Sequence, residues 1–137
     1  MPSLAKRAPA KPFLTTLRLD LARIESGVPT ATMSDFAASS GLALKDIYEV
    51  VIPARTLKHR RARREPLSRD ESDKLARLVR IFDHAVRVFD DPARARIWLN
   101  RPKRRFDNRT ALEMLRTEIG GRAVEEMLGQ IEYGMFA

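Results

Sequence analysis

The residues best suited to chemistry are the cations between positions 53 and 66, where six basic residues stand against one acidic residue. Such a density of Arg and Lys is typical of a polyanion-binding segment, because cations that meet phosphates release counterions and so strengthen binding. One large apolar residue, Leu57, predicts a helix over about residues 54–63 that is held from one side and presents its cations on the other. The alternative is that this run is only a solvated charged surface.

A helix predicted over residues 44–50 precedes this basic helix, and the two indicate a helix-turn-helix. Pro53 can begin the second helix, since the first turn does not use the N–H that proline lacks. In a helix-turn-helix, residues near the start of the second helix reach bases and later cations reach phosphates. We expect Arg55 and Thr56 to read base edges. The other predicted DNA-binding residues are Lys58, His59, Arg60, Arg61, Arg63 and Arg64.

No combination of residues in the sequence indicates catalysis, a metal or a cofactor. The chain has no cysteine, which excludes disulfides, thiolate zinc sites and a cysteine nucleophile. His84 lies opposite the apolar stripe of its predicted helix, so we expect it to be exposed, and no carboxylate or hydroxyl stands at a spacing that suggests a catalytic pair with it. Glu125 and Glu126 are adjacent and face different directions on a helix. Without a Gly-rich phosphate loop either, the chain is predicted not to be an enzyme.

The charge distribution predicts two kinds of partner. The 137 residues carry a net charge of +8, but residues 106–137 hold three basic against six acidic residues. A basic middle suits nucleic acid, and an acidic C-terminal part does not. Neither a secretory apolar run nor a stretch of about 18 apolar residues is present, so we expect a cytoplasmic protein with no membrane partner.

Helical periodicity recurs along the chain without any β-type alternation, so we predict an all-α fold. One helix is expected over residues 14–24, and a short one over residues 34–39 with a Ser34 cap and Gly41 at its end. A capping box from Ser68 to Glu71 begins a long helix with an apolar stripe that reaches Phe89. A weaker second stripe on that helix is our candidate dimer surface: Ile81, Ala85 and Val88.

The C-terminal part is expected to hold three shorter helices. Asp91-Pro92 begins one that buries Ile97, Trp98 and Leu99. A capping box from Thr110 to Glu113 opens the next, which includes Ile119 and is broken by Gly120-Gly121. The last carries apolar residues from Val124 to Ile131. We expect a disordered basic tail over residues 1–12, a helix-turn-helix domain over 13–66 and a helical toxin-binding domain over 67–137.

Five segments resemble the MbcA/ParS/Xre-type antitoxins of RES-Xre toxin-antitoxin systems. They are residues 52–57, 67–73, 95–99, 112–120 and 124–134. The most specific parts are Glu71-Ser72-Asp73 and the closing Leu128-Gly129-Gln130-Ile131-Glu132-Tyr133-Gly134. The resemblance covers roughly residues 27–137.

This resemblance implies a bacterial type II antitoxin that represses its own operon as a homodimer and binds a cognate RES-domain toxin that attacks NAD. In the family, the C-terminal end of the antitoxin blocks the toxin's NAD-binding cleft. Carried over residue by residue, the toxin-binding role falls on Ile131, Glu132, Tyr133, Gly134, Met135, Phe136 and Ala137.

The chain departs from the family pattern at two places. Asp107-Asn108-Arg109-Thr110-Ala111 replaces a common Gly-Gly-x-x-Pro turn, and Gln130 stands where Arg is common. Asn tolerates the left-handed conformation less readily than Gly does, so the turn geometry is open.

Two other functions remain possible on the sequence alone. The first is a plain helix-turn-helix regulator whose C-terminal helices only dimerise it, with its aromatic tail packed on its own core. The second is a basic adaptor that binds RNA, which is disfavoured because no stacking aromatic residues accompany the arginines.

Overall fold

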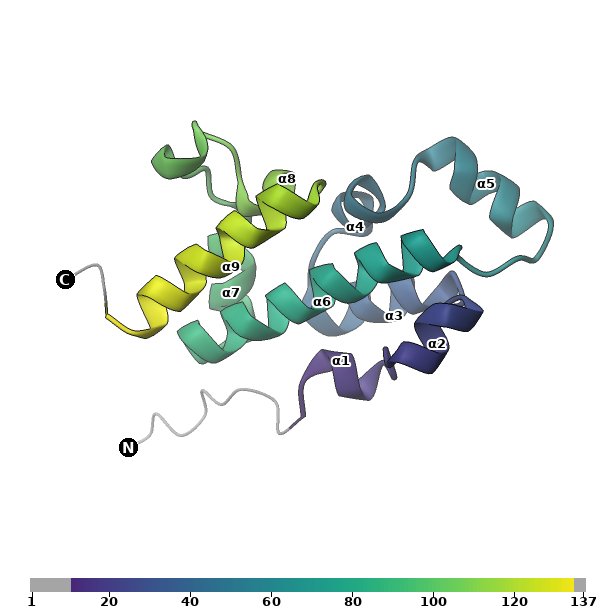
Figure 1. The fold of residues 1–137 in the computed structure, drawn as a ribbon, viewed down its shortest axis with the longest axis horizontal. Helices are drawn as coiled ribbons and strands as arrows, with labels where there is room; N and C mark the ends of the chain where they lie inside the picture. The colour runs from purple at the N-terminus through teal and green to yellow at the C-terminus, as the bar shows by residue number, and fades with distance from the viewer. Residues whose placement is uncertain (1–10, 135–137) are drawn as a thin grey trace. The chain divides into compact units, whose positions relative to one another are not determined.

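The computed structural model describes residues 11–134, which are mostly helical. Within this range the backbone pairs in β fashion only at an isolated bridge between Lys103 and Arg109, so the predicted all-α class is confirmed. The described chain forms two compact units, residues 11–80 and 81–134, and the boundary between them falls within the sequence of one long helix (Figure 1). Each unit is considered by itself below.

The unit of residues 11–80 consists of short helices and the first part of the long helix α6. The helices are α1 (Phe13–Thr16), α2 (Leu21–Ser26), α3 (Ala31–Ser40), α4 (Leu44–Val51), α5 (Ala54–Ala62) and α6 (Arg69–Phe89). Its core includes Met33, Phe36, Ile47 and Leu75, whose side chains are fully buried. Two segments far apart in sequence are also joined here, because the Val28 N–H donates to Ser72 Oγ at 2.9 Å.

The helix predicted over residues 14–24 is wrong, because the chain breaks there into α1 and α2. Arg18 adopts a left-handed conformation with φ of 57°. Asp20 then caps α2 by accepting a hydrogen bond from the Arg23 N–H at 2.9 Å. The break turns Leu19 into the core and leaves Leu21 69% exposed.

Helix α3 begins three residues before the predicted start at Ser34. Its N-cap is Thr30, which makes no side-chain capping hydrogen bond. The predicted end is correct, since Gly41 follows the helix with φ of 80°. Ser34 therefore lies on an exposed turn of α3 and does not cap it.

Helix α6 begins with the predicted capping box. The Ser68 N–H donates to Glu71 Oε1 at 2.8 Å, and the Glu71 N–H donates to Ser68 Oγ at 3.1 Å. The second stripe of α6 is not a dimer surface as expected, because Ile81 and Ala85 are completely buried in the monomer. The stripe was too apolar to stay at the surface once other helices packed around it.

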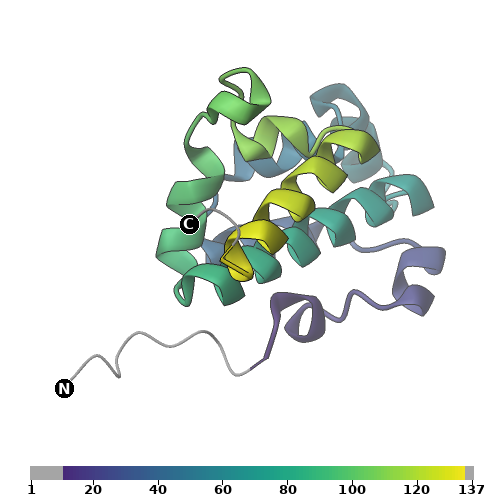
Figure 2. The same cartoon turned by 60° about the vertical axis from the view of Figure 1, so that its left-hand side comes forward.

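The unit of residues 81–134 contains the end of α6, α7 (Pro92–Asn100), the 3₁₀ helix η2 (Arg104–Phe106), α8 (Ala111–Met114) and α9 (Glu118–Glu132). In both views α9 runs along the last turns of α6 (Figures 1 and 2). The predicted Asp91 cap of α7 is present, with the carboxylate 3.3 Å from the Ala93 N–H. Ile97, however, is half exposed and not buried as predicted.

The substituted turn before α8 closes through two left-handed residues. Asp107 has φ of 55° and Asn108 has φ of 66°. The Asn108 N–H donates to the Lys103 carbonyl at 2.9 Å, and the Lys103 N–H donates to the Arg109 carbonyl at 3.0 Å. Asp and Asn tolerate this conformation better than other non-glycine residues, so the chain forms the turn without glycine. The Thr110 and Glu113 capping box then starts α8 as predicted.

The break predicted at Gly120-Gly121 is wrong, because both glycines lie in the first turn of the continuous helix α9. Thr117 caps this helix, and its Oγ1 accepts from the Gly120 N–H at 2.9 Å. A Cβ at position 120 would lie 1.9 Å from the Met114 carbonyl oxygen. Glycine is needed here for the close approach of α8 to α9, and the resulting turn points Ile119 outward.

We predict that Gly120→Ala destabilises the protein by about 3 kcal/mol, because the added methyl group overlaps backbone that cannot move easily. Chemical unfolding of the full chain would measure this loss. Gly129→Ala is the matched control, since a Cβ at position 129 meets nothing within 4 Å. A Gly120→Ala protein as stable as the wild type would contradict this account of the helix junction.

Candidate functional site

The basic helix α5 is attached to its unit mainly by one buried apolar residue and by contacts of two arginines. Leu57 is buried, as predicted. Beside it, Arg60 makes a two-pronged contact with Glu71, from Nε to Oε1 and from Nη2 to Oε2, both at 3.1 Å. Arg60 was predicted to contact phosphate, but in this structure its guanidinium is directed to the start of α6.

Glu71 remains ionised at this contact although its side chain is only 11% exposed. Burial alone would raise its pKa, but hydrogen bonds from Arg60 and the Ser68 N–H, together with the charge of Arg60, outweigh burial and lower the pKa. The same contact raises the pKa of Arg60. One carboxylate thus caps α6 and neutralises a cation of α5.

Arg61 also has a partner inside its own unit. Its Nη2 donates to Tyr48 Oη at 2.7 Å, and its guanidinium lies 5.5 Å from the centre of the Tyr48 ring. This contact links α5 to α4. Arg61 and Arg64 also line a shallow hollow beside Pro29 and Thr30 at the start of α3.

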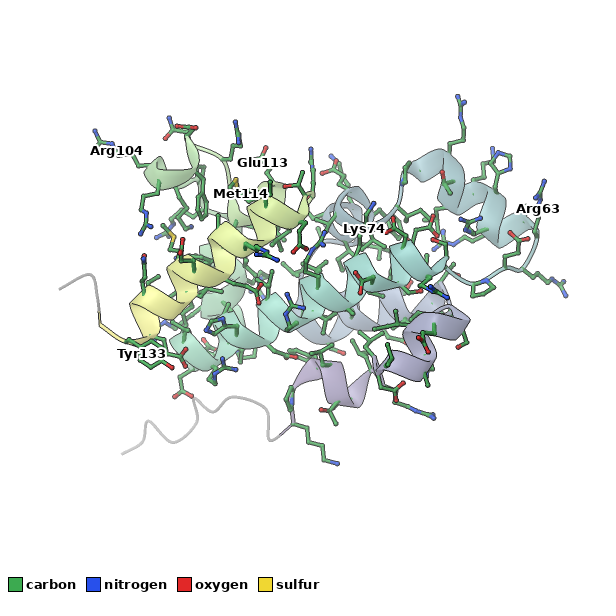
Figure 3. All side chains as sticks on the ribbon, viewed as in Figure 1. Arg63, Lys74, Arg104, Glu113, Met114 and Tyr133 are labelled. Atoms are coloured by element: carbon green, nitrogen blue, oxygen red, sulfur yellow. The ribbon has the colours of Figure 1, made fainter. Side chains whose placement is uncertain are left out.

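The side of α5 opposite Leu57 carries the outward-directed cations. A shallow surface hollow there is lined by Ala54, Arg55, Lys58, His59 and Ala62. Arg63 and Arg64 follow at the end of the helix and are exposed, and Arg63 projects away from it in Figure 3. Of the eight predicted DNA-binding residues, Thr56 is half-buried. Apart from Arg61, which is exposed but contacts Tyr48, the structure gathers five exposed basic side chains: Arg55, Lys58, His59, Arg63 and Arg64.

A helix-turn-helix turn lies one helix earlier than the sequence indicated. Helices α3 and α4 pack against each other and are joined by Gly41, Leu42 and Ala43, with Gly41 left-handed and Leu42 buried. A three- or four-residue turn with glycine is typical of this motif. The connection of α4 to α5 is only Ile52 and Pro53. By this criterion α4 is the second helix of the pair and α5 follows it.

In the unit of residues 81–134, the end of α9 is held by a charged cluster. Glu132 Oε1 lies 3.0 Å from His84 Nε2, and Glu132 Oε2 accepts from Arg87 Nε at 3.3 Å. The hydrogen bond with His84 is the largest effect on Glu132 and lowers its pKa; burial opposes it, and the hydrogen bond and charge of Arg87 add to the lowering. The prediction that His84 is exposed is therefore wrong, because its side chain is only 16% exposed and meets Glu132. Its partner lies 48 residues away in sequence, so no local pattern could have revealed it.

The loop before α8 is also tied to its unit through basic residues. Arg105 Nη1 donates to Gln130 Oε1 at 2.9 Å, so Gln130 accepts from an arginine within its own unit. Lys103 Nζ donates to the Trp98 carbonyl and stands 4.4 Å from the centre of the Trp98 ring. Burial, with repulsion from Arg101, lowers the pKa of Lys103 to about 8. These cations stabilise the loop.

The predicted toxin-binding residues fall into three groups. Ile131 is half-buried, and Glu132 is engaged by His84 and Arg87. Tyr133 ends α9 and is 80% exposed, and Gly134 follows with φ of 71° (Figure 3). Met135, Phe136 and Ala137 lie outside the described residues.

Comparison with known proteins gives a family to this arrangement. Residues 20–80 match the antitoxin Xre-like helix-turn-helix domain, and residues 84–134 match the antitoxin Xre/MbcA/ParS C-terminal toxin-binding domain. Antitoxin Xre of Photorhabdus laumondii is 33% identical over 114 residues, which are 82% of this chain and 77% of that protein. The chain belongs to the Xre antitoxin family. As the sequence predicted, this is a family of antitoxins and not of enzymes.

Two further relatives match shorter segments. Antitoxin Xre of Pseudomonas putida is 48% identical over 84 residues, and antitoxin Xre of Yersinia enterocolitica is 34% identical over 87 residues. The matches cover 61% and 63% of this chain. They span 53% and 59% of the lengths of those two relatives.

Residues 11–134 lack two kinds of feature, a membrane-spanning helix and a metal-binding cluster. No helix in that range is long and apolar enough to cross a membrane. No cluster of three or more His, Asp or Glu side chains in the same range could hold a metal ion.

We predict that the Arg60 and Glu71 contact stabilises the protein at neutral pH and loses its effect in acid. The folded-state pKa of Glu71 is lowered, so its contribution is complete above the unfolded value of about 4.3 and is lost as the pH falls through the folded value. Glu71→Gln retains the capping hydrogen bonds but removes the charge. We expect its free energy of unfolding to be about 2 kcal/mol lower than that of the wild type at pH 7, and this difference to shrink below about pH 4.

The matched control is Glu65→Gln, because Glu65 lies 3.8 Å from Arg60 with its side chain 46% exposed. An exposed pair of this kind contributes less than about 1 kcal/mol. A Glu71→Gln protein whose deficit stayed constant from pH 7 to pH 3 would show that the charge of Glu71 is not what stabilises the contact.

Proposed function

We propose that this chain is the antitoxin of a bacterial type II toxin-antitoxin pair that binds both operator DNA and a RES-domain toxin. Membership of the Xre antitoxin family supports this class of function. The observation that carries the proposal is the separation of two unlike exposed features. The unit of residues 11–80 has a face of exposed cations on α5, and the unit of residues 81–134 ends in the exposed Tyr133.

On DNA, we assign the phosphate contacts to the exposed cations of α5. Lys58, His59, Arg63 and Arg64 are directed outward, whereas Arg60 has a partner within the unit. Helix α4 is assigned to the major groove as the second helix of the pair, with Lys45 on its exposed side. Arg55, exposed at the start of α5, remains our candidate for a further base contact. Binding as a homodimer to the shared promoter would repress the operon.

On the toxin, we assign inhibition to the end of the chain. The contacts of Glu132 with His84 and Arg87 hold the last turn of α9 in a defined direction, and Tyr133 leaves that turn into solvent. An aromatic side chain costs free energy when it is exposed, and burying it in a partner recovers that free energy. Residues 133–137 are thus proposed to enter the toxin's NAD-binding cleft and exclude NAD.

For DNA, we predict that binding to the promoter of this chain's own operon weakens steeply with salt. Lys58→Ala should lower the affinity and reduce the slope of log affinity against log salt by about 0.9, the value for one lost phosphate contact. Fluorescence anisotropy at several NaCl concentrations would measure both. Arg104→Ala, an exposed arginine in the other unit, is the matched control and should leave the slope unchanged. Equal slopes for Lys58→Ala and the wild type would exclude this face from the DNA contact.

For the toxin, we predict that a chain ending at Glu132 no longer rescues cells that express the cognate toxin. Its promoter binding and unfolding midpoint should stay close to those of the full chain, because Tyr133 makes little contact with its own unit. Growth assays, anisotropy and thermal unfolding would be compared on the same variant. Joint loss of folding and rescue would mean that the tail belongs to the core. Unimpaired rescue would favour the regulator whose C-terminal helices only dimerise it.

A further inference from the structure

One face of α9 carries two exposed apolar residues without an internal role. Ile119 is 81% exposed and Tyr133 is 80% exposed. They are 14 positions apart, so at about 100° per residue their directions differ by about 40° around the helix axis, and they lie about 21 Å apart along it. Arg122 and Glu126 lie between them and are also exposed.

Gly129 lies on the same side of α9, and no contact within residues 11–134 requires a glycine there. Its φ is not in the left-handed region. A Cβ built on it would meet no atom of the described residues within 4 Å. Glycine weakens a helix relative to alanine, so an internal glycine without a packing reason is unfavourable for the isolated chain. Gly120 shows the contrast, since its missing Cβ is what lets Met114 approach.

We infer that the face of α9 defined by Ile119, Arg122, Glu126, Gly129 and Tyr133 is a toxin-docking surface, on which a toxin segment touches the helix backbone at Gly129. This inference rests on the proposed function and extends the contact by about four helical turns beyond the tail. The partner surface has an apolar recess for Ile119, a second for Tyr133, and a polar stretch between them that faces Arg122 and Glu126. The face lies wholly within the matched toxin-binding domain and is continuous with the proposed inhibitory tail.

A second copy of this chain fits the surface poorly. A two-fold antiparallel pairing that buries Ile119 against Tyr133 must be centred on the midpoint of these residues, which is Glu126. Glu126 would then face its own copy, and two like charges at the centre of the contact repel each other. The geometry therefore favours a different protein as the occupant.

The test is Gly129→Ala in the full chain, measured against the toxin encoded beside this gene. The unfolding midpoint of the free protein should rise, because alanine favours the helix, while the toxin affinity should fall about tenfold or more as the methyl group blocks the approach. Ile119→Ser should also weaken toxin binding, by about tenfold, without loss of folding. Promoter binding should be unchanged in both variants.

Matched controls separate these effects from general changes in stability or polarity. Ser34→Ala is the control for Gly129→Ala, because it raises helix propensity at an exposed position of α3 in the other unit. Leu21→Ser is the control for Ile119→Ser, because it replaces a leucine of that unit that is 69% exposed. Neither should alter toxin affinity. The inference is overturned if Gly129→Ala binds the toxin with wild-type affinity or has a lowered unfolding midpoint. It is also overturned if the substitution changes self-association, measured by light scattering, and leaves toxin affinity unchanged. A wild-type chain that does not bind the toxin would instead overturn the proposed function.

Discussion

The Glu71 carboxylate is the group through which the basic helix becomes part of a folded unit. Helix α5 holds several cations but buries only Leu57, so apolar packing contributes little to its attachment. Glu71 accepts a hydrogen bond from the Ser68 N–H, and this contact caps the start of α6. It also accepts from Nε and Nη2 of Arg60. Removing this charge would leave a partly buried guanidinium without its counterion and would loosen the connection of α5 to α6.

This constraint explains why the cations of α5 divide into two sets. Arg60 and Arg61 flank Leu57 on the helix and reach Glu71 and Tyr48. Arg55, Lys58 and His59 lie on the opposite side, where no acidic side chain of the unit is found in contact with them among the described interactions. A single amphipathic pattern therefore provides both attachment and an electropositive face, because Arg60 is neutralised by Glu71 and Arg61 is held against the neutral Tyr48.

In the other unit, polar contacts also attach the end of a helix. There the carboxylate lies on the attached helix, α9, and its basic partners lie on α6. Glu132 is held by His84 and Arg87 from α6, and Gln130 accepts from Arg105 of η2. These contacts stabilise the last turn while apolar residues anchor the helix at Val124, Met127 and Leu128. Tyr133 is left outside this set of contacts and is 80% exposed.

Local interactions were readable from the sequence by itself. The capping boxes at Ser68 and Thr110, the Asp91 cap, the left-handed Gly41 and the all-α class follow from side chains within a few residues of the groups they contact. The tertiary structure alone decided which cations face outward, that α9 continues through Gly120-Gly121, that Ile119 is exposed, and that His84 meets Glu132. The physical reason is distance along the chain: a hydrogen bond across 48 residues, or a carbonyl from another helix that leaves no room for a Cβ, exists only when separate elements have packed together.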